Sequence, residues 1–518
     1  MQRIKILLAA FSVLVCLSNL TAGNLQAGEY KGKDENSVAK SRSGKLEVRR
    51  GFFSVLWGDP KPGSDAREIK LFFLTDDAGK RIEIKVDTEA ISRAGGIASL
   101  HSRRVRINGR EEFDLNDAKS SFRAVEIIPE KESSGDEARL LPVSRKYVNI
   151  LCRFADFPNE SPRDLNYFNN LFGNTQPGLD HYWREASYGN VNIEGSATVG
   201  WYNLPAPRSA YIVNEQLDFD RAATDCAAIA DPDVYFPDYF GVNFIFNREL
   251  DGYAWGGSGE LNLDGGVRTY AMTFMPPWGY GNQSVMAHEM GHSLGLPHSS
   301  GGYTETYDSC WDPMSKTRGC VTADPIYGAT APHTISFHKD LLGWIPAERK
   351  FTAAAGTFNI NLQRLAQPPG ASGSDYLMAR IPVGTSGAEF YTIEVLRFFG
   401  YDSNIPAEAV LIHKVDNRRF DRQAQVVDAD GNGNPNDAGA QWTVGETFFD
   451  STNHISVAVN SVTATGFNVS ISMVSPTAAS VPVEGRVLSS KGRAVFGARV
   501  SAIDSNRATR FAFTNAFG

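Results

Sequence analysis

The segment His288-Glu289-Met290-Gly291-His292-Ser293-Leu294-Gly295-Leu296-Pro297-His298 carries the strongest structural information in the chain. Residues four apart lie on the same face of a helix, so His288 and His292 can present their imidazoles to one metal ion. Glu289 follows the first ligand, where its carboxylate can act as a general base on a water that the metal activates. Gly295 permits a left-handed turn that ends the helix. That turn would bring in His298 as a third ligand and leave the fourth position open.

The alternative is a core helix that carries histidines at these positions by coincidence. Only nine histidines occur in 518 residues, and three stand in register here, which favours a zinc site. The complete pattern, H-E-x-x-H-x-x-G-x-x-H, is the extended zinc motif of the metzincin proteases. Those enzymes also have a methionine turn below the metal, and Met314, directly after an Asp-Pro pair, fits that turn without being a ligand. Elsewhere a methionine is most often a core residue.

The composition is that of a globular protein with several domains. The length allows two to four hydrophobic cores, and 42% of the residues are hydrophobic and 21% charged. The net charge is −8, and no run of lysine or arginine indicates nucleic acid or an anionic membrane surface as a partner. We therefore expect no nucleic acid as a partner, whereas the zinc motif implies protein or peptide substrates.

The N-terminus has the features of a secretory signal. Two basic residues within the first five positions precede an apolar run over 6–17, and small residues offer cleavage after Ala22 or Ala27. A membrane anchor is the alternative, but this run is too short to span a bilayer, and no other run in the sequence reaches spanning length. Residues 1–27 are therefore expected to be a signal peptide, and the protein is expected to be secreted.

Four cysteines remain after the signal: Cys152, Cys226, Cys310 and Cys320. An even number in an exported chain favours disulfides. A Cys310–Cys320 bond would close a short loop around Met314, which leaves Cys152 with Cys226. Four cysteines allow three connectivities, and buried free thiols are the remaining alternative.

Residues 28–143 are expected to form a β-rich propeptide or, as an alternative, an accessory domain. The polar residues 28–60 are expected to be a flexible lead-in. Apolar alternation over 69–74 and 81–86, on either side of a turn at 75–79, predicts a hairpin.

An inhibitory propeptide in this position could not use a thiolate against the metal. No cysteine lies between Cys16 and Cys152, so a carboxylate or His101 would have to take that role. The charged stretch 130–139 is typical of a linker and a processing site.

Residues 144–350 are expected to form the catalytic domain. Apolar segments predict core strands at 147–154, 191–195 and 244–246, and helical patterns extend over 164–172, 178–186, 216–230, 282–294 and 334–342. A glycine-rich stretch at 251–266 is expected to be a surface loop or an edge strand that binds an extended peptide by strand addition. The expected fold class is α+β, with an α/β metzincin-like catalytic domain between β-rich domains.

Four segments resemble the immune inhibitor A-like family of secreted bacterial metalloproteases, to which the gametolysin-like proteases are related. They are 180–189 (DHYWREASYG), 288–299 (HEMGHSLGLPHS), 311–315 (WDPMS) and 338–344 (HKDLLGW). The resemblance covers about 145–475. It implies a zinc endopeptidase that is made as a precursor and exported, with His288, His292 and His298 as ligands and Glu289 as the base.

Residues 351–475 are expected to be a β-rich, sandwich-like extension of the protease, because 390–395 and 410–415 alternate or run apolar. Within it, oxygen-bearing side chains at alternate positions match the start of a calcium loop, at Asp428, Asp430, Asn432 and Asn434. Gly439 stands where an EF-hand would have its bidentate glutamate, so a complete EF-hand is not expected. A solvated turn rich in Asp and Asn is an equal alternative.

Residues 476–518 are expected to be a linker rich in Pro, Ser and Ala followed by a partial β-sandwich. The segments 483–487, 497–500 and 514–518 resemble the carboxypeptidase regulatory-like module, in which a further strand follows the Phe-Gly turn. The resemblance implies a module truncated at Gly518, and through it an association with a cell surface or matrix.

The sequence thus predicts a secreted zinc endopeptidase in which Glu289 moves a proton from water to the leaving amine. Tyr303 and Tyr307 are candidate donors to the transition state. One alternative is a secreted adhesion or carbohydrate-binding protein on a protease scaffold, although a pure binding protein has no need of the base Glu289. A zinc hydrolase of non-peptide substrates is the other alternative, because the motif indicates water activation and not the substrate.

Overall fold

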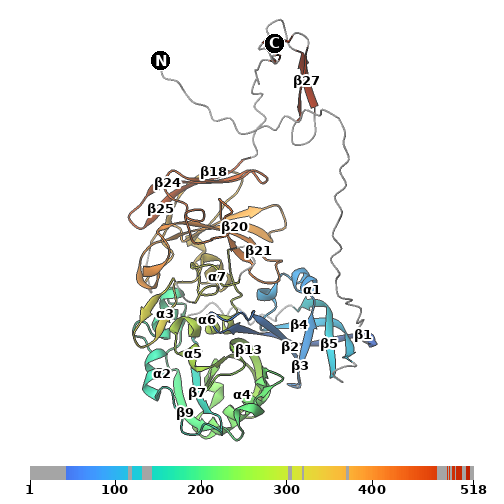
Figure 1. Cartoon of the computed structure of the whole chain (residues 1–518), viewed down its shortest axis with the longest axis vertical. Coiled ribbons are helices and arrows are strands. Elements are labelled where there is room, and N and C mark those ends of the chain that lie inside the picture. The colour runs from blue at the N-terminus through green and yellow to red at the C-terminus, as the bar shows by residue number, and fades with distance from the viewer. Residues whose placement is uncertain are drawn as a thin grey trace, which may run out of the picture.

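The computed structural model describes residues 42–114, 119–130, 143–301, 306–317, 320–368, 373–474 and short pieces of 487–513. Three parts of the chain follow one another: an N-terminal unit (42–129), a central unit (143–349) and an extension (350–474). Figure 1 shows the strands of the N-terminal unit beside the central unit, with the extension stacked above the latter. The expected signal peptide at 1–27, all but the first residue of the expected processing site at 130–139 and most of the segments that resemble the C-terminal module lie outside the described residues.

The fold is β-rich, with 40% of the residues in strands and 18% in helices, divided among several sheets. The expected α+β class, with an α/β metzincin-like catalytic domain, is therefore wrong. The main physical reason is the glycine-rich stretch, which forms a long hairpin of β13 (Tyr253–Leu263) and β14 (Gly266–Met275). β1 (Arg42–Pro60) pairs with the outer edge of β13, so that N-terminal and central strands make one continuous sheet.

Ten strands form this large sheet, in the order β2-β3-β5-β4-β1-β13-β14-β12-β7-β9. The other N-terminal strands are β2 (Ile69–Thr75), β3 (Arg81–Val86), β4 (Arg103–Asp114) and β5 (Lys119–Pro129). The other central strands are β7 (Tyr147–Arg153), β9 (Ala197–Asn203) and β12 (Gly241–Phe246). β7, β9, β12 and β14 are parallel, whereas β1 and β13 are antiparallel to each other.

β1 differs most from its expected structure, because residues up to 60 were expected to be a flexible lead-in. Its second half contains an apolar run whose members Phe53, Val55, Leu56 and Trp57 are fully buried. The strand is paired on both sides, with β2 and β4 along much of its length and with β13 at its end. A strand with both faces covered shows a continuous apolar run and no alternation. The expected hairpin at 69–86 is confirmed as the antiparallel pair of β2 and β3.

Helices form at the five expected positions, and two further short helices, the first and the fifth of those given next, were not expected. In chain order, the helices are α1 (Thr88–Arg93), α2 (Leu165–Leu171), α3 (Leu179–Ala186), α4 (Phe219–Ala230), α5 (Pro277–Tyr280), α6 (Gln283–Ser293) and α7 (Ser336–Leu341). α4 begins three residues later than expected because Asp218 caps it, with its side chain accepting a hydrogen bond from the Arg221 backbone N–H. Three short strand pairs complete the central unit: β6 (Val143–Ser144) with β8 (Val191–Asn192), β10 (Ile212–Val213) with β11 (Gln216–Leu217), and β15 (Thr322–Asp324) with β16 (Gly328–Thr330).

The extension consists of two sheets over one apolar core that includes Ile393, Val410, Val457 and Val469. One sheet contains β17 (Lys350–Thr352), β19 (Met378–Val383), β20 (Glu389–Leu396), β21 (Ala409–Asp416) and β22 (Ala424–Val426). The other contains β18 (Gly356–Gln363), β25 (Gly466–Met473), β24 (Ile455–Val462) and β23 (Thr447–Asp450). The strands expected at 390–395 and 410–415 are confirmed as β20 and β21. A separate hairpin joins β26 (Arg499–Ile503) to β27 (Thr509–Phe513).

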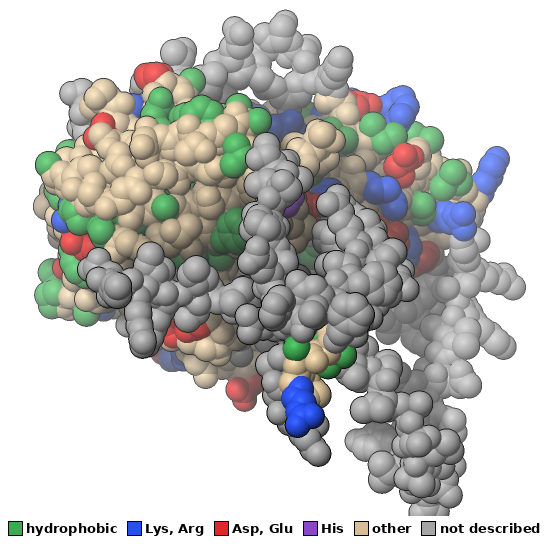
Figure 2. Space-filling model, turned by 90° about the horizontal axis from the view of Figure 1, so that it is seen from above, with side chains coloured by type: hydrophobic (Ala, Val, Ile, Leu, Met, Phe, Trp, Pro, Cys, Tyr) green, Lys and Arg blue, Asp and Glu red, His purple; other side chains and the backbone are tan. Residues whose placement is uncertain are grey.

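Both expected cysteine pairs are disulfide-bonded. Cys152 on β7 is joined to Cys226 on α4, and Cys310 to Cys320 around the segment of Met314. No helix among the described residues is both long and apolar enough to cross a membrane. On the face that Figure 2 shows, acidic and basic side chains of the described residues lie interspersed.

Candidate metal centre

The three histidines of the motif converge at the end of α6. His288 and His292 lie one turn apart on this helix, and Gly295, with a φ of +98°, reverses the chain so that His298 faces them. The Nε2 atom of His292 lies 3.1 Å from that of His288 and 3.2 Å from that of His298. All three side chains are almost completely buried. The structure therefore brings together the expected ligands.

A fourth group comes from the end of β1, far away in the sequence. The carboxylate of Asp59 places Oδ2 3.3 Å from His288 Nε2 and 3.2 Å from His292 Nε2, and Oδ1 2.9 Å from His298 Nε2. For a tetrahedral zinc ion with bonds of about 2.0–2.1 Å, neighbouring ligand atoms are separated by about 3.3 Å. The distances fit that spacing, and this buried group of one aspartate and three histidines could hold a metal ion.

The other ring nitrogens of the histidines have different partners. His288 Nδ1 lies 2.6 Å from the carbonyl oxygen of Pro313, and His292 Nδ1 lies 2.8 Å from that of Leu296. Each Nδ1–H can donate to its carbonyl, which leaves the Nε2 lone pair directed at the centre. His298 instead faces a carboxylate, Oδ2 of Asp421, at 3.4 Å.

Burial and the neighbouring charges control the protonation of this group. Burial lowers the pKa of His292 to about 3, so its imidazole is neutral. Burial also lowers the pKa of His298, but Asp59 and Asp421 outweigh it and raise that pKa to about 9. Burial raises the pKa of Asp59, but His298 and His288 outweigh this effect, so that the pKa lies well below its usual value. A metal cation at this centre would replace the proton of His298 as the partner of the carboxylates.

Glu289 lies beside the four candidate ligands and is not one of them. Both of its carboxylate oxygens are buried, and neither has a hydrogen-bond partner among the described residues. Burial, together with the negative charge of Asp59, raises the pKa of Glu289 well above its usual value. The side chain lines a cavity of about 240 Å³, together with Trp278, Val285 and Lys316 among other residues. A carboxyl group at this place can exchange a proton with a molecule bound between it and the metal.

Met314 lies below the centre, at the place expected for the methionine turn. It is fully buried, and its Sδ atom occupies the space that a side chain at Gly291 of α6 would need. Its carbonyl oxygen accepts a hydrogen bond from the backbone N–H of Ser299, the residue after the third histidine. Met314 thus supports the helix from below without contributing a ligand atom.

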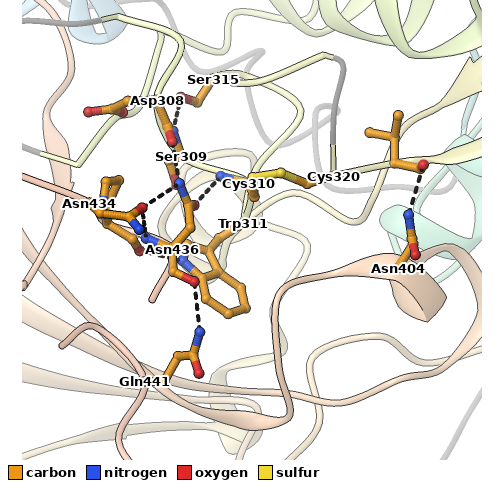
Figure 3. Close-up of a disulfide and its surroundings, with 12 residues drawn as sticks. Asp308, Ser309, Cys310, Trp311, Ser315, Cys320, Asn404, Asn434, Asn436 and Gln441 are labelled. Atoms are coloured by element: carbon orange, nitrogen blue, oxygen red, sulfur yellow. Dashed lines mark hydrogen bonds between the residues drawn. A yellow bond between two sulfur atoms is a disulfide. The ribbon is translucent and has the colours of Figure 1, made fainter. Parts of the chain in front are cut away.

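The loop closed by the Cys310–Cys320 disulfide is hydrogen-bonded to the extension (Figure 3). Asn436 accepts a hydrogen bond from the Cys310 backbone N–H at 2.7 Å and donates one to the Asp308 carbonyl at 2.6 Å. The indole N–H of Trp311 donates to the carbonyl of Pro435 at 2.8 Å. The loop that contains the expected calcium residues therefore also fixes the disulfide loop.

The calcium loop itself differs from the expected one. The carboxylates of Asp428, Asp430 and Asp437 lie together, with oxygen atoms within 4.8 Å of one another. The Asn432 side chain directs its amide N–H groups at Asp430 and Asp437, and the Asn434 side chain accepts from the Asn436 backbone. Asp428 and Asp430, two of the expected residues, thus lie together with Asp437, which the sequence analysis did not single out.

The sequence interpretation missed three other residues at the centre: Asp59, Asp421 and Trp57. Trp57 is stacked on the His292 ring, at 4.7 Å between centroids and 4° between planes. The sequence feature that could have drawn attention to Asp59 is its place between Gly58 and Pro60, at the end of an apolar run. His101, the histidine that the sequence analysis considered for capping the metal, is not in the group of candidate ligands, and its Nδ1 accepts a hydrogen bond from the Val55 backbone.

Of the two tyrosines considered as donors, one lies at the centre. The hydroxyl of Tyr307 donates a hydrogen bond to Oδ1 of Asp59, and its ring lies 5.6 Å from that of His298. Burial and the nearby Asp59 raise the pKa of Tyr307 well above its usual value, so the hydroxyl keeps its proton. Tyr303 lies outside the described residues.

Comparison of the chain with protein-family models, with curated proteins and with solved structures finds no match. The chemistry of the centre therefore follows from its own geometry and from the residues that surround it.

Proposed function

We propose that this protein is a secreted, zinc-dependent endopeptidase that its N-terminal unit holds inactive. The observation that supports this proposal most strongly is the centre of His288, His292, His298 and Asp59, with the unpaired Glu289 beside it. Three imidazoles and one carboxylate at tetrahedral spacing suit zinc. Zinc supplies the Lewis acidity that activates water and polarises a carbonyl. The resemblance to the immune inhibitor A-like proteases supports the same function.

The residues around the metal would divide the remaining chemistry between them. Glu289 accepts a proton from the attacking water and later donates it to the leaving amine, a role that suits a buried carboxyl with a raised pKa. Tyr307 keeps its hydroxyl proton and can donate a hydrogen bond to the oxygen that becomes negatively charged. Glu289 comes from α6 and Tyr307 from the segment that follows His298, and both side chains line the same cavity beside Asp59 and His288.

The N-terminal unit occupies two places that a substrate needs. Asp59 takes the fourth ligand position, where water and the peptide carbonyl must come. β1 pairs antiparallel with β13 from Leu56 opposite Gly257 to Pro60 opposite Tyr253, along the edge where an extended peptide would add. Activity therefore requires that β1 leaves this edge.

Calcium is the ion we propose for the loop of Asp428, Asp430 and Asp437. Carboxylate oxygens are the ligands that calcium prefers. An ion there would fix the position of Asn436, and with it the backbone of Cys310.

The test combines metal analysis with controlled cleavage between the N-terminal and central units. A recognition sequence for a specific protease replaces residues 131–136, and casein hydrolysis is followed before and after the cut. We expect one zinc ion per chain, activity only after the cut, and loss of that activity in Glu289→Gln with the zinc retained. A cut chain that holds zinc but leaves casein and small peptides intact would instead support a binding protein or a hydrolase of other substrates.

A further inference from the structure

One of the three zinc ligands differs from the other two in the partner of its Nδ1 atom. His288 and His292 face backbone carbonyl oxygens, whereas His298 faces Oδ2 of Asp421 at 3.4 Å. Asp421 lies 123 residues further along the chain, in the loop between β21 and β22 of the extension. Its side chain is only 9% exposed.

The loop is fixed to the segment of His298 by backbone hydrogen bonds. Ser300, two residues after His298, donates its N–H to the Ala424 carbonyl, and its own carbonyl accepts from the N–H of Val426. These bonds join the metal-binding segment to β22, directly after Asp421. The distance between Asp421 and His298 is therefore determined by the central unit and the extension, without the N-terminal unit.

The N-terminal unit contributes a counter-charge to the same carboxylate. Nζ of Lys70, on β2, lies 2.8 Å from Oδ2 of Asp421 and 3.5 Å from Glu68. The second oxygen of Asp421, Oδ1, is buried and has no hydrogen-bond partner among the described residues. Burial raises the pKa of Asp421, but Lys70 and then His298 lower it well below its usual value, so the carboxylate is charged.

We propose that Asp421 is the positioning residue of the third zinc ligand. Its carboxylate accepts the Nδ1 proton of His298, which fixes the tautomer with a free Nε2 and makes that nitrogen a stronger ligand. In the full chain Lys70 shares the charge of this carboxylate, and its departure with the N-terminal unit leaves His298 as the ionic partner of Asp421. The departure of Lys70 with the N-terminal unit rests on the proposed function, whereas the positioning role of Asp421 requires only that the centre binds a metal.

The test measures metal affinity in the full chain. Zinc dissociation constants are obtained by competition with a chelator for the unchanged protein, Asp421→Ala, Asp421→Asn and the control Glu68→Gln. We expect Asp421→Ala to weaken zinc binding by about 10–100-fold, the usual effect of removing such an outer partner. Asp421→Asn keeps an oxygen acceptor without the charge, and we expect it to restore part of the loss. Glu68→Gln removes a charge beside Lys70 that has no contact with a histidine, and it should leave the zinc affinity unchanged.

A purely structural role predicts a different set of results. It would lower the unfolding temperature of the metal-free protein and leave the absorption bands of bound cobalt(II) as they are, whereas a positioning role changes those bands in Asp421→Asn. The proposal is overturned if both Asp421 variants bind zinc within roughly threefold of the unchanged chain, because an outer partner of this kind contributes more than that. If Asp421→Ala does not fold, Asp421→Asn, which has nearly the same shape, decides the question. Because metal affinity is the readout, a lack of peptide cleavage would count against the proposed function alone.

Discussion

Replacing Asp59 by alanine in the full chain should turn a latent protein into a partly active one. The Asp59 side chain is 9% exposed and contacts three histidines and the hydroxyl of Tyr307. Its removal takes away the one ligand atom that the N-terminal unit supplies to the centre. The pairing of β1 with β13 and the stacking of Trp57 on His292 remain, so the N-terminal unit stays bound but dissociates more easily.

The size of the effect follows from the burial of the group. Removing one partner from a buried charged pair typically costs about 3–5 kcal/mol. Each factor of ten in an equilibrium corresponds to about 1.4 kcal/mol, so the ratio of open to closed chains should rise by roughly 100–4,000-fold. The rate of substrate cleavage by the uncut chain should rise by the same factor, because only open chains bind substrate. Asp59→Asn keeps a weak oxygen ligand, so its cleavage rate should lie between the rates of the unchanged chain and of Asp59→Ala.

The assay is cleavage of a quenched fluorescent peptide by the uncut protein at equal zinc content. Asp65→Ala is the matched control, since Asp65 is an exposed aspartate in the turn after β1. Asp59→Ala combined with Glu289→Gln excludes a contaminating protease. If Asp59→Ala and the unchanged chain have equal rates before the cut and equal rates after it, Asp59 does not maintain latency and the argument is refuted.

Three further predictions concern the surroundings of the centre. Tyr307→Phe should lower kcat by about 10²-fold in the cut protein while zinc is retained, as for loss of one oxyanion donor, and stopped-flow kinetics would test this. Burial raises the pKa of Asp312, but His338 at 2.9 Å outweighs it and lowers the pKa to about 2, below the value of 3.8 for a free group. Asp312 therefore contributes about 2 kcal/mol of stability above pH 4 that is lost as the pH falls to about 2. Denaturant unfolding at pH 5 and pH 3 should show a smaller acid destabilisation for Asp312→Asn. Calcium at a hundred times its Kd should stabilise the unchanged chain by about 2.7 kcal/mol, measured by thermal unfolding, but not Asp437→Ala.

The parts of the centre that the sequence could predict are those whose geometry is local. The spacing of His288, Glu289 and His292 determines their places on a helix, and Gly295 determines the reversal that brings in His298. The helices of the central unit and the β2–β3 hairpin were predictable for the same reason, since each depends on a periodic pattern within a few turns.

The partners from distant segments could not be predicted in this way. Asp59 and Asp421 reach the centre only because β1 pairs with β13 and because Ser300 is bonded to β22, and neither pairing has a local pattern. The same limit explains the wrong fold class. Counting helical and strand-like segments did not reveal that the N-terminal strands extend the central sheet, and sheet extension depends on edges that become visible only after folding.

In the proposed function, one part of the chain would block the centre and another part would complete it. The N-terminal unit supplies Asp59, which would keep substrate from the metal, and Lys70, which pairs with Asp421. β1 of this unit lies along the edge of β13. The extension supplies Asp421 behind His298 and holds the disulfide loop through Asn436, in both cases together with backbone hydrogen bonds. Separating the N-terminal unit exposes a strand edge that a peptide can occupy, whereas separating the extension would leave buried polar groups of the metal-binding segment without partners. The smallest active unit should therefore extend from the start of the central unit to the end of β25, and a protein that ends at 350 should bind zinc weakly even if it folds.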